Sequence, residues 1–564
     1  MYRLFFFLLI LVQYSSLSQE FTVKPYLQNA EPNSMVVMWE YSKFDSSFLE
    51  WGESTGLGNT VSVTYEFTNY PACVYTANIF GLEADKKYFY RVISGNSVSN
   101  VYDFKTPAIS SNEEPINIVV MSDMQRDGNN PNKFHQIVHD GIFEYIHTHY
   151  DTSLSEGLDM LMIPGDLVNT GTDYYHWKDQ FFGPAYPLFS SVPIYPVLGN
   201  HEMNSDFFFQ YFDLPKNGTQ GFEEHWWYKD NSNVRIIGLN SNSGYRIQKQ
   251  LDWLDSVLYL TSIDNSIDFV FAQLHHPHKS EQWTPGNTDF TGEIVKLLEE
   301  FTSSSGKPSV HFYGHTHGYS RGQSKDHTHL MVNVATSGGY IDYWGEWPQQ
   351  DYLEYSVSQD EWGYVFLEIE AGENPQFTLR RLSLGDDNIV KNNSVEDSVI
   401  IRFYNNSPNT PIGIFPLPYD TISSNTMYLV ADDFFDIDGD LHGASHWQIS
   451  NYCNDFSNLI FDSWKQYENW YFDINTQAND NLIDEEIVNL EPHSNYCWRV
   501  RYRDRSLAWS EWSLPIPFFT DASIESNRLV KIVDILGRDI KLKNNNICFY
   551  IYEDGSVEKK IILD

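Results

Sequence analysis

Five short polar clusters, each directly following an apolar run, constrain the fold of this chain more than any other feature. The clusters occupy residues 122–125, 165–169, 199–202, 275–277 and 314–317, and the apolar runs before them are 118–121, 160–164, 194–198, 269–274 and 311–313. Each run has the length and composition of a buried β-strand. Because the carboxyl ends of neighbouring strands meet at one edge of an α/β sheet, we expect the clusters to form a single site.

The region around these clusters has the pattern of an α/β domain, which we place at residues 115–385. Strand-like runs alternate with helical patterns along it. Helices are expected at 132–148, 248–258 and 292–301, and additional strands at 116–121, 234–239, 330–335 and 362–369. This alternation predicts central sheets flanked by helices.

Two other stretches have the pattern of β-sandwiches, because short β-rich runs in them are separated by turn residues. These stretches are residues 19–107 and 408–520. They share a signature, in which Leu82 is followed by Tyr88 and Leu490 by Tyr496 at the same spacing. The repeat resembles the tyrosine-corner region of fibronectin type III domains. We therefore expect two fibronectin type III-like modules that position the domain between them.

Both ends of the chain have the pattern of targeting segments. Arg3, the apolar run 4–12 and a small-residue cleavage pattern predict a signal peptide at residues 1–18. Residues 525–564 resemble the C-terminal sorting domain of proteins exported by type IX secretion; the alternative is a small β-module without a sorting role. Residues 386–407, rich in Asn, Asp and Ser, predict a linker. We expect a secreted or cell-surface protein that engages secretion machinery, with no membrane span in its mature chain.

The charge balance excludes some classes of partner. The 36 Lys and Arg residues stand against 76 Asp and Glu, so the net charge is −40. Such a surface repels nucleic-acid phosphates and anionic lipids, and we expect no nucleic-acid binding. A small phosphate substrate is still compatible with this charge, because bound metal ions invert the field locally. Of the four cysteines, Cys453 and Cys497 lie in one predicted sandwich, where they either pair or stay buried free thiols.

The polar clusters supply carboxylate, amide and imidazole groups, a donor set that suits Zn, Fe or Mn. Gly-Asp at 165–166, Gly-Asn-His-Glu at 199–202 and Gly-His-x-His at 314–317 together resemble the calcineurin-like metallophosphoesterase superfamily. Within it, the chain looks most like the purple acid phosphatases, which also place a fibronectin-like domain before the catalytic one. The resemblance covers about residues 20–385.

This resemblance implies a multidomain fold. A fibronectin type III-like β-sandwich would precede an α/β metallophosphoesterase β-sandwich with flanking helices, and a second β-sandwich and a small C-terminal β module would follow. The resemblance also implies two metal ions about 3.5–4 Å apart, either divalent or a di/trivalent pair of Fe, Zn or Mn.

The roles of individual residues follow from the same resemblance. Asp166 would bridge both ions and take part in catalysis. The other ligands would be Asp123 and His317 at the first ion, and Asn200, His275 and His315 at the second. His201 would contact the phosphate and protonate the leaving group as a general acid. A metal-activated hydroxide would attack phosphorus in line.

The first metal site departs from both family patterns. Superfamily members usually carry a histidine where this chain has Gln125, and purple acid phosphatases carry a metal-binding tyrosine where it has Asn169. The phenolate of that tyrosine gives those enzymes their colour. Gln125 or Asn169 would coordinate through an amide oxygen, or water would fill the position.

Other residues are weaker candidates. His278, Lys279 and Arg321 are expected to bind substrate, with solvent-facing roles as the alternative for the first two. A rim for an organic leaving group could be formed by Tyr343, Trp344 and Trp347, although packing is the commoner role of such aromatics. Three aspartates within 436–440 resemble the start of a calcium loop but lack the distal glutamate, so we interpret them as an acidic turn, with calcium as the alternative.

The sequence thus predicts an exported metal-dependent phosphoesterase that hydrolyses small-molecule phosphomonoesters. One alternative is a phosphodiesterase with the same dinuclear centre. Another is a non-catalytic adhesion or binding protein with a lapsed phosphoesterase domain. His201 and the complete ligand set of the second metal argue against such a lapse, whereas Gln125 and Asn169 leave it open.

Overall fold

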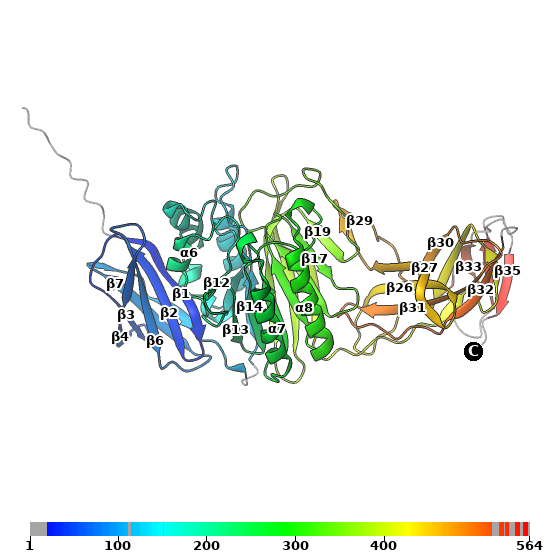
Figure 1. The fold of residues 1–564 in the computed structure, drawn as a ribbon, viewed down its shortest axis with the longest axis horizontal. Coiled ribbons are helices and arrows are strands. Elements are labelled where there is room, and N and C mark those ends of the chain that lie inside the picture. Colours follow the sequence, from blue (N-terminus) through cyan, green and yellow to red (C-terminus); the bar gives the residue numbers. More distant parts are fainter. Residues whose placement is uncertain are drawn as a thin grey trace, which may run out of the picture.

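The computed structural model describes residues 20–110, 114–150, 152–521, 529–534, 536–540, 547–552 and 557–561. The predicted signal peptide and parts of the predicted sorting segment lie outside these residues. The molecule is elongated, with one β-sandwich (blue) at one end, an α/β domain in the middle and another β-sandwich (yellow to orange) towards the other end (Figure 1). This arrangement confirms the predicted multidomain fold.

The first sandwich contains β1 to β9. Its strands are β1 (Phe21–Glu31), β2 (Ser34–Tyr41), β3 (Ser47–Gly52), β4 (Asn59–Ser62), β5 (Thr64–Phe67), β6 (Cys73–Phe80), β7 (Lys87–Ser94), β8 (Ser97–Val98) and β9 (Tyr102–Lys105). They form the sheets β1-β2-β6-β5 and β4-β3-β7-β8, with β9 on β7. Alternate side chains of β7 are buried, as expected for a strand with one face on the core.

The repeated sequence signature makes the same contact in both sandwiches. The hydroxyl of Tyr88 accepts a hydrogen bond from the amide of Glu83 at 2.9 Å, and the hydroxyl of Tyr496 accepts one from the amide of Glu491 at 3.1 Å. Each bond fastens the chain before a strand to the strand itself. The spacing in the sequence therefore corresponds to a repeated local structure.

The central domain contains two stacked sheets with strand orders β12-β11-β10-β20-β21-β22 and β13-β14-β15-β16-β18-β17-β19-β28-β29. The strands of the first are β10 (Ile116–Val120), β11 (Met160–Ile163), β12 (Ile194–Pro196), β20 (Trp362–Glu370), β21 (Gln376–Gly385) and β22 (Val390–Arg402). Those of the second are β13 (Trp227–Asn231), β14 (Val234–Gly238), β15 (Phe269–Gln273), β16 (Ser309–Tyr313), β17 (Tyr319–Gln323), β18 (His329–Val334), β19 (Tyr355–Gln359), β28 (Trp470–Tyr471) and β29 (Ile474–Asn475).

Helices flank these sheets. Helical segments are α1 (Lys133–Gln136), η2 (Ile137–Phe143), α2 (Glu144–Tyr150), α3 (Leu154–Gly157), α4 (Tyr174–His176), η3 (Trp177–Phe182), α5 (Gly183–Ala185), η4 (Leu188–Ser190), α6 (Asp206–Tyr211), η5 (Ser243–Tyr245), α7 (Gln248–Ser262), η6 (Thr284–Gly286) and α8 (Asp289–Ser305). The longest two, α7 and α8, bury one face each beside the second sheet, for example Leu254 and Leu298. No helix among the described residues is long and apolar enough to cross a membrane.

The strand order brings the polar clusters together. Strands β10, β11 and β12 are parallel neighbours in one sheet, and β15 and β16 are parallel neighbours in the other. The five predicted clusters follow these five strands at their carboxyl ends. Strand residues such as Val119 and Phe271 are fully buried in the core between the sheets, so the loops after them have fixed starting points.

The predicted linker at 386–407 is wrong for most of its length. Residues Val390–Arg402 form β22, which pairs along its length with β21. The inner face of this strand is defined by Asp397, Val399 and Ile401, which are buried and alternate with the exposed residues Ser398 and Ile400. The abundance of Asn, Asp and Ser between 386 and 398 concealed this strand in the sequence.

The second sandwich lies beyond β22. Its strands are β23 (Gly413–Phe415), β24 (Thr421–Ser423), β25 (Thr426–Ala431), β26 (His442–Tyr452), β27 (Asp455–Gln466), β30 (Asp484–Val488), β31 (Asn495–Asp504) and β32 (Ile516–Asp521). Cys453 and Cys497 form a disulfide in it. The described part of the C-terminal tail adds a sheet of β33 (Leu529–Val533), β34 (Ile547–Tyr552) and β35 (Val557–Ile561).

The second sandwich is docked on the central domain through directed contacts. The guanidinium of Arg503 donates hydrogen bonds to the carbonyls of Ser324 at 2.7 Å and His327 at 2.8 Å. The indole of Trp509 donates to the carbonyl of Lys325 at 2.6 Å. Strand β28, which lies between β27 and β30 in the sequence, pairs in parallel with β19 and so extends the central sheet.

We predict that Asp397→Asn lowers the free energy of unfolding of the central domain by about 3–5 kcal/mol. Asp397 accepts hydrogen bonds from Arg321 at 2.6 and 3.0 Å and from the Tyr319 hydroxyl at 2.7 Å, and both side chains of the ion pair are nearly fully buried. The substitution leaves a buried guanidinium short of its main counter-charge. Urea unfolding followed by tryptophan fluorescence measures the change. Glu300→Gln, in an exposed pair with Lys296, is the control and should change little.

Candidate metal centre

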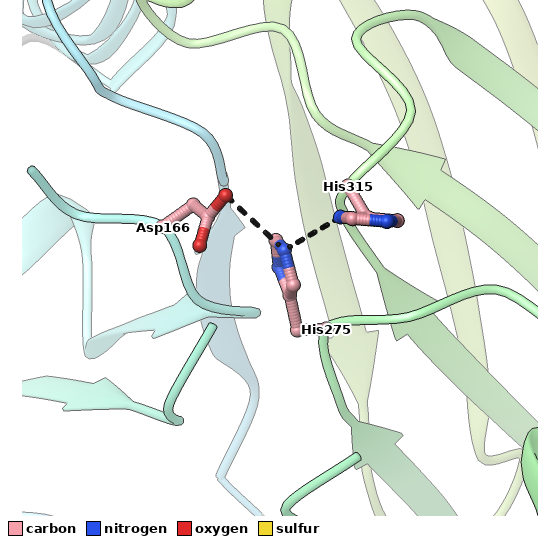
Figure 2. Close-up of side chains that lie close together, drawn as sticks. All are labelled: Asp166, His275 and His315. Carbon is pink, nitrogen blue, oxygen red and sulfur yellow. Dashed lines mark hydrogen bonds and ion pairs between the residues drawn. The ribbon is translucent and has the colours of Figure 1, made fainter. Parts of the chain in front are cut away.

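Three side chains from three different strand ends converge in the centre of the site. Asp166 follows β11, His275 follows β15 and His315 follows β16, and one ligand atom from each lies within 4.8 Å of the others. Among the described residues, no other group of three His, Cys, Asp or Glu side chains meets this criterion. Figure 2 shows the three side chains pointing toward one another. Nδ1 of His315 and Nε2 of His275 lie 3.2 Å apart, as two nitrogens directed at a common ion would.

Asn200 completes this group. Its side-chain oxygen lies 2.9 Å from Nε2 of His275, which itself lies 3.2 Å from the Oδ2 atom of Asp166. The other ring nitrogen of His275 faces the carbonyl of Pro164 at 2.9 Å and so carries the proton. Nε2 is therefore the nitrogen directed at Asp166 and Asn200, and a metal ion that replaced its proton would find the arrangement of a metal-binding histidine.

A second group of candidate ligands is connected to Asp166 through Gln125. Nε2 of His317 is 3.2 Å from Oδ1 of Asp123, and the amide nitrogen of Gln125 donates to Oδ2 of Asp166 at 3.0 Å. Nδ1 of His317 faces the carbonyl of Tyr340 at 2.5 Å, so this histidine also directs Nε2 into the site. Asp123 is fully buried.

The loops that carry the ligands have unusual backbone conformations. Asp123, Asp166 and His315 have φ angles of 60°, 54° and 74°, in the left-handed region that non-glycine residues seldom occupy. The loops also touch, because a Cβ atom on Gly199 would lie 2.1 Å from Oδ1 of Asp166. Strain and close packing of this kind persist only where the surroundings enforce them.

Glu202 holds two of these loops in place. Its buried carboxylate accepts hydrogen bonds from the amides of Asp166 at 2.9 Å, Leu167 at 2.8 Å and Gly199 at 2.8 Å. Burial, followed by the negative charge of Asp166, raises the pKa of Glu202 to about 8. Sequence analysis included Glu202 in the third cluster but gave it no role, although its place in Gly-Asn-His-Glu was a usable signal.

The loop after β18 orients His317. The carboxylate of Asp342 accepts the His317 amide at 2.8 Å, and the Asp342 amide donates to the His317 carbonyl at 2.9 Å. Trp347 donates from its indole nitrogen to the same carboxylate at 3.0 Å. Trp347 also belongs to an aromatic wall with Trp283, whose ring lies 4.9 Å from that of His315. Sequence analysis missed Trp283, which lies in no recognised motif.

The charges of the site favour cations. Burial alone would lower the pKa of His275, but the charge and hydrogen bond of Asp166 raise it to about 9. Burial alone would likewise lower the pKa of His317, but the hydrogen bond and the charge of Asp123 raise it to about 10. His315, by contrast, has its pKa lowered to about 3 by burial and by the neighbouring His275 charge. The two carboxylates thus stabilise positive charge at this edge.

These residues fit metal ions. The donors are carboxylate oxygens, amide oxygens and imidazole nitrogens, and the nitrogens of His275 and His317 are fixed toward the site by backbone carbonyls. Oε1 of Gln125 is buried without a hydrogen-bond partner, so this side chain has an unused donor oxygen beside the site. The set suits Zn, Mn or Fe rather than a soft, thiolate-binding ion.

His201 lies at the open side of the site. Its side chain is 38% exposed, and its Nε2 atom is 3.8 Å from Oδ2 of Asp166. Nδ1 faces the carbonyl of Asn169 at 2.7 Å and its backbone amide donates to Oδ1 of Asp166 at 2.9 Å. The ring is thus oriented with Nε2 toward the site, where it can exchange a proton with a bound ligand.

The two departures from the family patterns have different outcomes. Gln125 lies among the ligands, as described above. The side chain of Asn169 is instead bound to the main chain of Arg126, whose amide donates to Oδ1 at 2.9 Å. Tyr174, the nearby tyrosine, donates its hydroxyl to Glu40 at 2.6 Å in the first sandwich. Within the described residues, neither Asn169 nor Tyr174 directs a side chain to the ligand group.

The three predicted substrate-binding residues are engaged elsewhere. Arg321 is buried and pairs with Asp397, so its assignment to the substrate is wrong. The ammonium of Lys279 lies 2.5 Å from Glu354, which neutralises it away from the ligands. The half-buried ring of His278 packs against α8, where a Cβ on Gly292 would lie 2.7 Å from it.

Comparisons with known proteins agree with this site. Residues 116–319 match the family model described as calcineurin-like phosphoesterase, and residues 22–106 match that described as purple acid phosphatase, N-terminal domain. Two successive parts of the chain are thus similar to a calcineurin-like phosphoesterase and to the N-terminal domain of purple acid phosphatases. No curated protein sequence matches the chain.

Solved structures show the same fold. A purple acid phosphatase, PPD1, from yellow lupin (Lupinus luteus) seeds superposes with a TM-score of 0.55 and 16% identity, covering 67% of this chain and 74% of its own. A structure of PhoD superposes with a TM-score of 0.50 and 11% identity, covering 68% of this chain and 90% of its own. At these identities the likeness establishes the fold.

We predict that Glu202→Gln lowers metal affinity or turnover by about 10- to 100-fold while the fold is retained. Glu202 accepts hydrogen bonds from three backbone N–H groups, but a glutamine side chain has only one acceptor oxygen. Its NH₂ group would therefore face at least one of these N–H groups, and that hydrogen bond would be lost. Metal titration and circular dichroism measure the two effects. Glu223→Gln is the control, because this exposed carboxylate accepts a single amide, from Gly221. Equal effects of both substitutions would contradict the role given to Glu202.

Proposed function

We propose that this chain is a metal-dependent phosphoesterase that hydrolyses phosphomonoesters at a centre of two metal ions. The observation that carries the proposal is that the Asp166 carboxylate contacts both ligand groups. Its Oδ2 atom lies 3.2 Å from Nε2 of His275, in the group with His315 and Asn200, and accepts from Gln125 at 3.0 Å, in the group with Asp123 and His317. A carboxylate in this position can serve both ions.

The proposal assigns distinct tasks to the chain's own residues. Asp166 and Asn200 hold the two ligand groups close together, and Glu202 fixes the loops that carry them. When bound, metal ions would lower the pKa of a water and neutralise charge on the phosphoryl oxygens. Nδ1 of His201 donates to the Asn169 carbonyl, so Nε2 is the nitrogen that faces the site. As an imidazolium, His201 can give its Nε2 proton to the leaving oxygen and become the neutral ring with its proton at Nδ1.

The assignment to phosphomonoesters is supported by the purple acid phosphatase N-terminal domain at residues 22–106. The substrate enters from the side of Asn200 and His201, which are the most exposed members of the site. The aromatic pair of Trp283 and Trp347 borders the same site next to His315. An organic leaving group therefore has an apolar surface close to the metal ligands.

The test compares the wild-type chain with Asp166→Asn. The wild type should bind about two metal ions and turn over an aryl phosphomonoester, and the variant should lose at least about 100-fold in rate together with metal content. Metal analysis and chromogenic assays measure both. Asp252→Asn, at an exposed site on α7, is the matched control. Faster turnover of an aryl phosphodiester would contradict the monoester assignment, and no turnover of either ester with metal bound would contradict the phosphoesterase.

We predict that His201→Ala keeps its metal but loses about 10²–10⁴-fold in rate on alkyl phosphomonoesters. An alkoxide needs a proton to leave, and the imidazole at 3.8 Å from Asp166 is positioned to give it. Esters with strongly acidic leaving groups need no proton and should lose much less. A plot of rate against leaving-group pKa measures this difference. If the loss is the same for good and poor leaving groups, His201 is not the general acid.

A further inference from the structure

A second cluster of oxygen ligands lies far from the site described above, where the second sandwich begins. It combines two asparagines that follow β22, a turn before β26 and the last residue of β31. We call it the acidic junction, and its residues are Asn405, Asn406, Asp436, Asp438, Asp440 and Asp504. Sequence analysis interpreted its central turn as an acidic turn, with calcium as the alternative.

Hydrogen bonds connect the asparagines to the aspartates. The side-chain nitrogen of Asn405 lies 3.2 and 3.1 Å from the two carboxylate oxygens of Asp504. The backbone and side-chain nitrogens of Asn406 donate to the carboxylate of Asp438 at 2.7 and 2.9 Å. Two consecutive residues of the connection thus bind two different parts of the second sandwich.

The junction contains oxygen atoms that nothing satisfies. Asp436 is 8% exposed; its Oδ1 atom accepts the amides of Asp438 and Asp440, but its Oδ2 atom is buried with no hydrogen-bond partner. Oδ2 of Asp440 and Oδ1 of Asn405 are also buried without a partner. Buried acceptors are nearly always paired in folded proteins, so three orphaned oxygens in one cluster indicate a missing ligand.

The charges point to a cation. Four carboxylates meet here, and the nearest guanidinium, Arg402, pairs with Oδ1 of Asp440 at 3.0 Å. Arg505 is placed over the ring of Tyr467 at 3.6 Å. Burial raises the pKa of Asp440, and the charges of Asp436 and Asp438 raise it further, although Arg402 opposes them. The carboxylates are therefore close enough to repel one another.

We propose that the acidic junction binds one calcium ion. The available ligand atoms are carboxylate and amide oxygens. Because the junction contains no cysteine sulfur and no histidine nitrogen, it favours a hard cation. No three carboxylates of the junction have ligand atoms within 4.8 Å of one another, so a bound ion would take the rest of its ligands from amide, main-chain and water oxygens. Calcium accepts six to eight oxygens, including amide and main-chain carbonyl oxygens, in flexible geometry, whereas Mg²⁺ demands a tight octahedron.

The position of the junction defines what the ion does. Arg402 ends β22 of the central domain, and Asn405 and Asn406 follow it at the entry to the second sandwich. Asp504 ends β31, next to Arg503, which contacts the central domain through the carbonyls of Ser324 and His327. An ion bound between these segments neutralises the junction and holds the second sandwich on the central domain.

The ion has a route to the junction. A cavity of about 270 Å³ lies between the central domain and the second sandwich. Asp440 and Asp504 line it on one side, and Arg321 and Ser398 line it on the other. Two of the proposed ligands, Asp440 and Asp504, therefore border a space large enough for an ion and its waters.

Calcium titration of the full-length, zinc-loaded protein tests the proposal, because zinc occupies the centre around Asp166. Calorimetry should detect one additional calcium ion per chain with a dissociation constant of about 10⁻⁴–10⁻³ M, and at least about tenfold weaker magnesium binding. Hydrogen exchange at residues 405–406 and 436–440 should slow when calcium is added. If neither a binding heat nor slower exchange is found in the wild type, the proposal is overturned.

Two variants locate the ion. Asp436→Asn and Asp440→Asn should each weaken calcium binding at least about tenfold and abolish the calcium-dependent protection, while turnover of the zinc-loaded enzyme is unchanged. Asp455→Asn, an exposed aspartate of the same sandwich that accepts the amide of Ser457, is the matched control and should bind calcium as the wild type does. Unchanged affinity in both junction variants, or equal weakening in the control, would place the ion elsewhere and overturn the proposal.

Discussion

The carboxylate of Asp166 is the group on which the whole site depends. Oδ1 accepts the amide of His201, and Oδ2 accepts Gln125 and lies next to His275. One side chain at the end of β11 thereby connects segments from both central sheets. Its own backbone has a left-handed conformation, which the three amides bound by Glu202 help to maintain. The fold supplies two rigid sheets, and the Asp166 side chain connects the loops at their adjoining edges, so that these loops form one site.

The site could be predicted from the sequence because each ligand is local to a strong strand signal. Asp123, Asp166 and His275 directly follow buried apolar runs, and the end of a parallel strand has a defined place in space. Arg321 could not be placed in this way, since its environment depends on Asp397, a residue 76 positions away in a strand that sequence reasoning took for a linker. The local sequence pattern therefore predicts helices, strands and the ends of strands. Which charged side chains are available to a substrate depends on ion pairs between residues far apart in the sequence, and the local pattern does not show these.

The departures at the first metal position have an electrostatic consequence. A phenolate would bring a third negative charge to the carboxylates of Asp123 and Asp166, but Asn169 is neutral and is bound to the backbone of Arg126. Gln125, which does reach the site, is also neutral. Two carboxylates neutralise a pair of divalent ions more completely than they would neutralise a pair that includes ferric iron. We therefore propose that the site takes two divalent ions; among the described residues, neither Asn169 nor Tyr174 brings a phenolate to the ligand group.

The second sandwich is connected to the site through the central sheet that contains β19, and not by residues that would contact the substrate. Its segment after β27 supplies β28 to the central sheet and places Phe472 against Trp344, with ring centres 5.5 Å apart. Trp344 belongs to the same loop as Asp342, which orients His317 by two hydrogen bonds. A module that resembles a separate domain in sequence thus packs behind a loop that holds a metal ligand. Arg503, bound to carbonyls of the β17–β18 turn, fixes the other side of this contact. Because these contacts are directional hydrogen bonds and strand pairing rather than a flexible tether, the second sandwich has a defined orientation on the central domain.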